Sequence, residues 1–249
     1  MGIPVAVQLY TVREETNKDF IGTLEKVANI GYKGVEFAGY GDIPASTMAD
    51  TLKRLGLKAA GSHVGLDLLK DHLDEVIAYN LEIGNQYILC PWAQFETKND
   101  YVKMAKFLNE TGRKCKEAGV TLGYHNHDFE FTTFDGEHGL DILYKETEPS
   151  YVVAEIDTYW VQRAGVDPIA YVKKYAGRCP LIHLKDMEAG EVKDYAEVGN
   201  GIMDIAGIVA VAEQSGVKWL IVEQDKCKKP PLESIAISME NLKKMGIVK

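Results

Sequence analysis

The sequence predicts an α/β protein whose residues 1–249 form a single domain, a closed (β/α)8 barrel. Three observations carry this prediction: the chain length, the alternation of apolar runs with amphipathic stretches, and the number of those runs. Barrels of this type take about 250 residues, and this chain has 249. Strands that alternate with helices pair as a parallel sheet, and eight such units close it into a barrel.

Eight short apolar runs, rich in β-branched residues, predict buried strands. They cover residues 5–10, 34–38, 58–63, 87–92, 121–127, 152–157, 181–184 and 219–223. A polar turn follows each run. The next run begins after a stretch in which apolar residues recur at helical spacing.

These helical stretches fill the intervals between the runs. Phe20, Leu24, Val27 and Ile30 form one apolar stripe along a helix. Comparable patterns cover residues 48–55, 69–77, 101–118, 139–144, 168–175, 205–215 and 232–245.

Glycines mark the expected helix ends, because glycine adopts a left-handed backbone at low cost. They are Gly31, Gly56, Gly84, Gly119, Gly177, Gly216 and Gly246. The alternative architecture is an open doubly wound sheet, which carries a glycine-rich loop after its first strand. Residues 8–13 contain no glycine, so the closed barrel is favoured.

Composition narrows the class of partner. The chain has 28 Lys and Arg against 37 Asp and Glu, a net charge of −9, whereas nucleic-acid binders present basic surfaces. No segment approaches the about 20 apolar residues of a membrane-spanning helix. The four cysteines form no CxxC pair, which favours reduced thiols and a cytoplasmic location. We therefore expect neither a nucleic-acid nor a membrane partner.

Ionisable residues collect where the predicted strands end, which is where (β/α)8 barrels place their active sites. Four of the six histidines fall there, together with three carboxylates. These residues are His63, His125, His127, His183, Glu36, Asp157 and Glu223. Buried without a role, such groups would be costly, so the sequence predicts an active site built from them.

Four of these side chains can converge on one metal ion. Asp157, His183 and Glu223 come from successive strands, spaced about 4.8 Å apart, and the strand before them supplies His125 or His127. A mixed nitrogen and oxygen site suits Mn²⁺, Zn²⁺, Co²⁺ or Fe²⁺ better than Mg²⁺ or Ca²⁺. We expect one divalent ion, with Mn²⁺ favoured and His125 as the fourth ligand.

The sequence resembles the sugar phosphate isomerase/epimerase superfamily, the xylose isomerase-like TIM barrels, over its whole length. The matching segments are residues 7–13 (VQLYTVR), 34–37 (GVEF), 124–131 (YHNHDFEF), 157–158 (DT), 183–186 (HLKD), 198–201 (VGNG) and 222–225 (VEQD). The resemblance implies one divalent metal held by Asp157, His183, Glu223 and a glutamate on the fifth strand.

That glutamate is missing here, since its position falls on Gly123 or His125. His125 or His127 must replace it, or Glu130 must reach in. In addition, Trp160 stands where the family often has histidine.

The resemblance implies a sugar isomerase or epimerase that removes a proton next to a carbonyl. A metal ion stabilises the resulting enediolate as a Lewis acid, and a nearby base moves the proton. We assign Glu223 as ligand and base, His127 as the second acid/base, and Lys185 as proton donor or oxyanion stabiliser. The alternative for Lys185 is a structural ion pair with Asp186 or Glu155.

Loss of the fifth-strand glutamate also favours another outcome of the same first step. A His/Lys pair could expel a β-leaving group, which would make the chain a lyase or hydratase (a dehydratase or β-eliminase) of an inosose or 3-keto-glycoside. Two weaker alternatives are an apurinic endonuclease-like phosphodiesterase and a non-catalytic sugar-binding barrel.

A small sugar is the expected substrate, and Gln8, Tyr10, Glu36, His63 and Trp92 are the residues expected to bind it. Glu36 could instead bond a neighbouring histidine. Gly199 and Gly201 flank Asn200 in a loop whose backbone could approach the substrate, although such a pair of glycines more often only forms a turn. The absence of an arginine cluster favours a non-phosphorylated sugar. Relatives in this family are often dimers or tetramers, so we also expect self-association.

Overall fold

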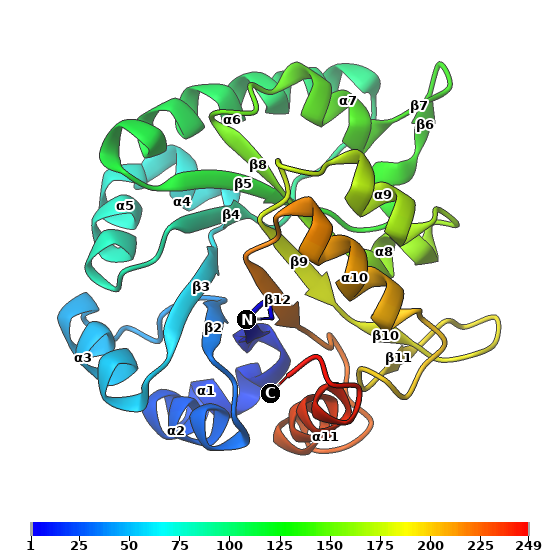
Figure 1. The fold of residues 1–249 in the computed structure, drawn as a ribbon. Coiled ribbons are helices and arrows are strands. Elements are labelled where there is room, and N and C mark those ends of the chain that lie inside the picture. The colour runs from blue at the N-terminus through cyan, green and yellow to red at the C-terminus, as the bar shows by residue number, and fades with distance from the viewer. Residues whose placement is uncertain (1, 249) are drawn as a thin grey trace.

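The protein is described by a computed structural model covering residues 2–248, and its centre is a closed barrel of eight parallel strands (Figure 1). Around the barrel the order is β1-β2-β3-β4-β5-β8-β9-β12, and β12 pairs with β1. The strands are β1 (Val5–Gln8), β2 (Gly34–Phe37), β3 (Lys58–His63), β4 (Tyr87–Cys90), β5 (Thr121–His125), β8 (Val152–Asp157), β9 (Leu181–Leu184) and β12 (Trp219–Val222). The predicted single-domain (β/α)8 barrel is confirmed.

All eight predicted runs form these strands, but several strands end earlier than the runs. The first run turns after Gln8 into a 3-10 helix, η1 (Leu9–Val12). The Gln8 side chain causes this turn, because its oxygen accepts the backbone N–H of Tyr10 at 2.9 Å. Tyr10 therefore projects from the rim and not from the strand.

Helices surround the barrel as an outer ring (Figure 1). They are α1 (Arg13–Lys18), α2 (Phe20–Ile30), α3 (Ala45–Leu55), α4 (Leu66–Asp71), α5 (Leu73–Glu82), α6 (Lys98–Ala118), α7 (Gly139–Glu146), α8 (Thr158–Arg163), α9 (Pro168–Lys174), α10 (Ile205–Ser215) and α11 (Pro231–Lys244). The stripe predicted over residues 69–77 is divided between α4 and α5, because His72 leaves the helical conformation (φ −135°). α11 packs against α2, and the Tyr32 hydroxyl donates to the Ile235 carbonyl at 2.8 Å.

The glycines predicted to end helices all have positive φ angles. Gly56 ends α3 at φ 67°, and its N–H donates to two carbonyls of the last turn. Two small hairpins were not predicted, because strands of two residues carry no alternation. They are β6 (Thr133–Phe134) with β7 (Glu137–His138), and β10 (Asp186–Met187) with β11 (Tyr195–Ala196).

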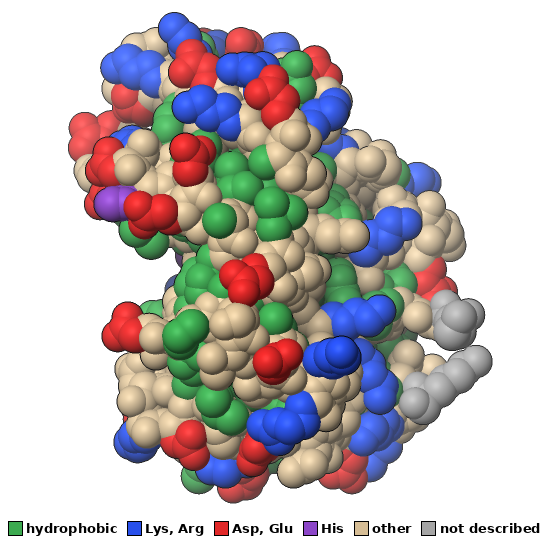
Figure 2. All heavy atoms as spheres, turned by 90° about the vertical axis from the view of Figure 1, so that its left-hand side faces the viewer, with side chains coloured by type: hydrophobic (Ala, Val, Ile, Leu, Met, Phe, Trp, Pro, Cys, Tyr) green, Lys and Arg blue, Asp and Glu red, His purple; other side chains and the backbone are tan. Residues whose placement is uncertain are grey.

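Acidic and basic side chains lie interspersed over the outer face that carries α3 and α5 (Figure 2). Among residues 2–248, no helix combines the length and the apolar character needed to cross a bilayer.

The start of β2 lies close to β3 and β12 at the amino-terminal end of the barrel strands. A Cβ atom added at Gly34 would lie 2.8 Å from the Lys58 carbonyl and 2.9 Å from the Trp219 ring. By contrast, a Cβ added at Gly65 (φ −60°) would meet no atom within 4 Å.

We therefore expect Gly34→Ala to destabilise the protein by about 1–3 kcal/mol, because β3 and the Trp219 ring must both shift. Gly65→Ala is the matched control and should change stability by less than about 1 kcal/mol. Urea denaturation followed by circular dichroism measures both. Equal stabilities of the two variants would contradict the close approach at Gly34.

Candidate active site

The carboxyl ends of the strands carry a buried cluster of charged side chains. β8 supplies Glu155 and Asp157 on one face, since side chains two residues apart point the same way. β9 supplies His183, with Lys185 directly after it, and Glu223 follows β12. The side chains of these five residues are at most 5% exposed. Isolated charges would be expensive at such depth, so they must compensate one another.

The upper part of the cluster brings together His125, Asp157, His183 and Glu223, from β5, β8, β9 and β12. One ligand atom of each lies within 4.8 Å of the others. His183 Nδ1 is 2.8 Å from Glu223 Oε2, and His125 Nε2 is 3.4 Å from Asp157 Oδ2. Of the two histidines left open by the sequence, His125 lies in this group. His127 lies beside it, with its ring centroid 5.1 Å from that of His125.

The donor set fits one divalent cation. Both ring nitrogens of His125 are buried and have no hydrogen-bond partner among residues 2–248, and such orphaned polar atoms call for an explanation. Two imidazoles with two carboxylates are ligands that Mn²⁺, Zn²⁺, Co²⁺ and Fe²⁺ accept. Glu130 does not reach this group. Its carboxylate accepts the Tyr124 hydroxyl and the His127 N–H, both at 2.8 Å.

Lys185 places a buried ammonium beside the same carboxylates. Its Nζ lies 2.9 Å from Asp157 Oδ2, 2.8 Å from Glu223 Oε2 and 2.7 Å from Asp225 Oδ2. Burial alone would lower the pKa of Lys185, but these three carboxylates raise it well above its usual value. The sequence offered Asp186 or Glu155 as ion-pair partners of Lys185. The partners in the structure are instead Asp157, Glu223 and Asp225.

A lower layer supports the cluster from inside the barrel. Glu36 Oε2 lies 2.8 Å from His183 Nε2 and accepts the Gln8 amide at 2.8 Å. Gln8 and Glu36 are fully buried, and neither is among the residues that line the cavity above the cluster. Glu36 bonds a neighbouring histidine, the second role that the sequence allowed for it. A proton held on Nε2 of His183 by Glu36 leaves Nδ1 available to a cation.

His63 belongs to this lower layer and also reaches the surface of the site. Its Nε2 is 2.7 Å from Glu155 Oε2 and 3.2 Å from Glu36 Oε2. Burial raises the pKa of Glu36 to about 7, and the charge of Glu155 adds to this effect. A second group of donor atoms, from His63, His125, Glu155 and His183, also lies within 4.8 Å. It shares two histidines with the upper group, and its carboxylate is already paired with His63.

A cavity of about 330 Å³ opens above the cluster. Its lining comprises Tyr10, Ala38, His63, Pro91, Trp92, His125, His127, Lys185, Glu223 and Asp225. Tyr10, His63 and Trp92, expected to bind substrate, are therefore on its wall. Burial lowers the pKa of His127 to about 3, helped by the charges of His125 and Lys185, so this imidazole is neutral at neutral pH.

Trp160 is a further aromatic residue of the site. Its ring centroid lies 5.5 Å from that of His127, and the Lys185 ammonium lies 5.3 Å from the ring centre. The family often has histidine at this position. Here Trp160 takes that place, and its buried indole N–H is a donor without a partner among the described residues.

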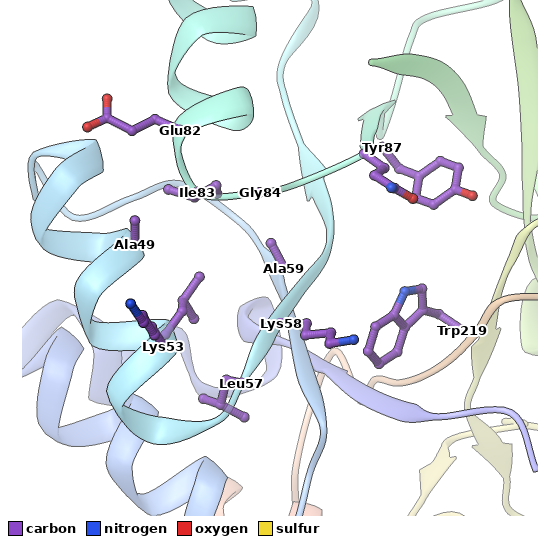
Figure 3. A pocket seen from close by; sticks show the side chains of 12 residues that line it. Ala49, Lys53, Leu57, Lys58, Ala59, Glu82, Ile83, Gly84, Tyr87 and Trp219 are labelled. Atoms are coloured by element: carbon purple, nitrogen blue, oxygen red, sulfur yellow. The ribbon is translucent and has the colours of Figure 1, made fainter. Parts of the chain in front are cut away.

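A larger hollow, of about 540 Å³, lies at the opposite end of the barrel (Figure 3). Its wall carries Lys53, Lys58, Glu82, Tyr87 and Trp219. The three charged side chains are exposed, and no histidine is among the residues that line it. Of these two cavities, only the smaller one is lined by buried titratable groups. The smaller cavity is therefore the candidate active site.

The glycine loop after β9 is held by Asp186. One carboxylate oxygen accepts the N–H groups of Gly199 and Gly201, at 2.8 and 2.9 Å. The other accepts those of Met187 and Met203, at 2.8 and 3.1 Å. Both N–H groups are thus used within the loop, as in the simple turn that the sequence offered as the other interpretation of the two glycines.

From the sequence, Glu155 and Asp186 were considered only as possible ion-pair partners of Lys185, and Asp225 was given no role. Glu155 lies two residues before Asp157, so the alternation of strand side chains was a usable signal for it. Asp186 begins the two-residue strand β10 and Asp225 lies in the loop after β12, so no periodicity marks either residue.

The barrel thus gathers histidines and carboxylates that could hold a metal ion at the carboxyl ends of its strands. The family model described as "Xylose isomerase-like TIM barrel" matches residues 24–245. The chain belongs to this family.

Relatives with curated names include an inosose dehydratase from Clostridium tetani (strain Massachusetts / E88), 30% identical over 156 residues, which are 55% of this chain. The match spans only about half of that relative, 52% of its length. An inosose dehydratase from Mesomycoplasma hyopneumoniae (strain 7448) is 23% identical, and the match covers 91% of this chain and 88% of that protein.

Solved structures share the fold. A sugar phosphate isomerase/epimerase from Parabacteroides distasonis ATCC 8503 superposes with a TM-score of 0.87 at 24% identity, and 100% of each chain is covered. A protein named IOLI, with a bound zinc atom, gives a TM-score of 0.78 at 16% identity, with 98% of this chain and 97% of that chain covered.

Glu130 accepts the backbone N–H of His127, and the pH dependence of protein stability tests whether this buried carboxyl is protonated. Burial raises its pKa from 4.5 to about 8, so the folded protein binds this proton more tightly than the unfolded chain. Its contribution to stability is then present below about pH 4.5 and is lost as the pH rises toward about 8. Glu130→Gln keeps an uncharged side chain at every pH.

We expect Glu130→Gln to gain stability relative to the wild type between about pH 5 and about pH 8, by at most about 4 kcal/mol. Denaturant unfolding at the two pH values measures the difference. A constant difference between the two proteins would show that Glu130 is ionised in the folded state.

Proposed function

We propose that the protein is a metal-dependent lyase that expels a leaving group from the carbon β to the ketone of an inosose or keto sugar. The observation that carries this proposal is that His127 and Lys185 both line one cavity, directly above the buried cluster. At the fifth strand, where an epimerase of the family has a glutamate, this chain has Gly123 or His125, and neither is a carboxylate. The names of the curated relatives support the same reaction class.

In this proposal His125, Asp157, His183 and Glu223 hold one divalent cation, for which the zinc-containing neighbour offers a parallel. The cation would supply Lewis-acid stabilisation of charge at the carbonyl oxygen of the substrate. Lys185 touches the same oxygens of Asp157 and Glu223. The ammonium also contacts Asp225 Oδ2 at 2.7 Å, a carboxylate outside the proposed ligand set.

His127 is the proposed base. Its imidazole lines the cavity, and its buried Nδ1 has no partner among residues 2–248. It takes the proton from the carbon between the ketone and the carbon that bears the leaving group. Glu223, the base expected from the sequence, already contacts His183 and Lys185 through one oxygen. We therefore place it second.

Lys185 is the proposed acid. As the C–H electron pair forms the new C=C bond, the bond to the leaving oxygen breaks, and Lys185 Nζ gives that oxygen a proton. Water leaves from an inosose, and an alcohol leaves from a glycoside. The Trp160 ring beside Lys185 excludes solvent from this side.

The cavity wall fits an uncharged polyol. Tyr10 and Trp92 offer apolar ring faces for C–H groups, and Trp92 is 52% exposed. Glu223 and Asp225 offer acceptors for hydroxyl groups. Two carboxylates on the wall disfavour a phosphorylated substrate, since a phosphate group would be repelled by them.

An isomerase or epimerase is the second candidate. The carboxylate of Glu223 on the cavity wall favours it, because a second base could return the proton to another face or carbon. Both reactions begin with the same proton abstraction, so they differ only in the fate of the enediolate.

Metal binding tests the ligand set. After chelation and dialysis, we expect the protein to bind about one equivalent of Mn²⁺ or Zn²⁺ in calorimetry. Glu36→Gln should weaken binding about 10–100-fold, because it loosens the orientation of His183, and Asp157→Asn should weaken it more. Glu130→Gln is the matched control and should bind as the wild type does. Unchanged binding by Asp157→Asn would rule out this ligand set.

Isotope exchange tests the reaction class. With inososes and keto sugars in D₂O, we expect deuterium incorporation together with loss of water. His127→Asn should slow the exchange about 10²–10⁴-fold without loss of metal. Lys185→Gln should retain exchange but slow the elimination. Exchange that yields a new stereoisomer and no loss of water would favour the epimerase, and metal-loaded protein without exchange would contradict both reactions.

A further inference from the structure

A second hollow adjoins the candidate active site at the rim of the barrel, and Trp92 lines both. This rim groove has a volume of about 390 Å³ and lies between α4, α6 and the loop that follows β4. Its lining is Leu66, Lys70, Trp92, Ala93, Gln94, Phe95, Asp100, Lys103, Met104 and Phe107.

The two hollows differ in chemistry. The catalytic cavity carries histidines, a lysine and two carboxylates. The rim groove offers Phe95, Phe107, Met104 and Leu66, while its Lys70 and Lys103 are exposed side chains. A molecule that fills both therefore has a polar reacting end and an apolar end that does not react.

Trp92 connects the groove to the proposed base. The edge of its ring meets Phe129 at a centroid distance of 6.4 Å, and Phe129 stacks on His127 at 5.6 Å. Trp92 and His127 are thus separated by one ring and line the same cavity, so a group that rests against Trp92 extends from the part of the substrate that His127 faces. In an elimination, this is the place of the leaving group.

We propose that the rim groove binds the aglycone of a glycoside, so that the preferred substrate is a 3-keto-glycoside with an aromatic or other apolar aglycone. This inference rests on the proposed lyase function and narrows its substrate class. An inosose would occupy the catalytic cavity and leave the groove empty.

The step balances without an added oxidant. The substrate already carries the ketone at C3, and His127 takes the proton from C2. The C1–C2 double bond forms as the bond from C1 to the glycosidic oxygen breaks. The aglycone leaves with that electron pair and receives a proton from Lys185, which gives an unsaturated keto sugar and a free alcohol or phenol. A reaction that oxidises C3 of a glycoside must therefore supply the substrate.

The test compares phenyl and methyl 3-keto-glucosides with an inosose, all with the metal-loaded protein. We expect kcat/KM for the phenyl glycoside to exceed that for the methyl glycoside by about 10–200-fold, the range for apolar pocket contacts. Because phenol is also the better leaving group, the variant Phe107→Ala isolates the groove. It should lower kcat/KM for the phenyl substrate about tenfold and leave the methyl substrate and inosose exchange unchanged.

Val102→Ala is the matched control, since Val102 is exposed on the same helix but does not line the groove. It should change neither substrate. If Phe107→Ala fails to fold in circular dichroism, Phe107→Leu, which keeps the volume but removes the ring, gives the same comparison with a smaller loss.

The outcomes separate the two proposals. Turnover of the inosose with no effect of Phe107 variants on the phenyl substrate overturns the rim groove and leaves the lyase. Absence of exchange on every substrate overturns both. A dimer in solution that Phe107→Ala dissociates would make the groove an interface between copies, which also overturns the aglycone site.

Discussion

His183 joins the two layers of charge at the carboxyl end of the barrel, and the geometry of the site depends on this residue. Its Nδ1 faces Glu223 and its Nε2 faces Glu36, each at 2.8 Å. Burial alone would lower the pKa of His183, but Glu155, Glu36 and Glu223 raise it well above its usual value. A buried carboxylate without such a partner would cost several kcal/mol. The ring is therefore held in one orientation by groups on both of its sides.

The same cluster links the proposed acid to the proposed cation. Lys185 contacts oxygens of Asp157 and Glu223 that belong to the candidate ligand set. The Lys185 ammonium and a cation bound by this ligand set would therefore compete for the same carboxylate oxygens. His127 stands outside this network and lines the cavity, where it can contact the substrate. The proposed roles of cation ligand, acid and base therefore follow from which side chains Asp157 and Glu223 already contact.

Around this rigid centre, the loops after the strands decide what can enter. Asp186 ties the loop after β9 through four backbone N–H groups, and Glu130 ties the loop after β5 to Tyr124. The loop after β4 instead presents Trp92 to solvent, between a polar cavity and an apolar groove. Specificity is thus expected from loops, while the chemistry is held by strands.

The sequence by itself determined the barrel, because strands, helical stripes and the glycines at helix ends are local patterns. It also placed Asp157, His183 and Glu223 on successive strand ends, since alternation fixes the face of each side chain. Only the tertiary structure decided depth and partners. Alternation cannot tell that Gln8 and Glu36 lie beneath the cavity while His63 reaches its wall, because depth depends on the register between strands. Nor can it tell that Glu130 turns toward Tyr124, or that Lys185 bridges three carboxylates, because these contacts depend on how loops and separate strands come together in space.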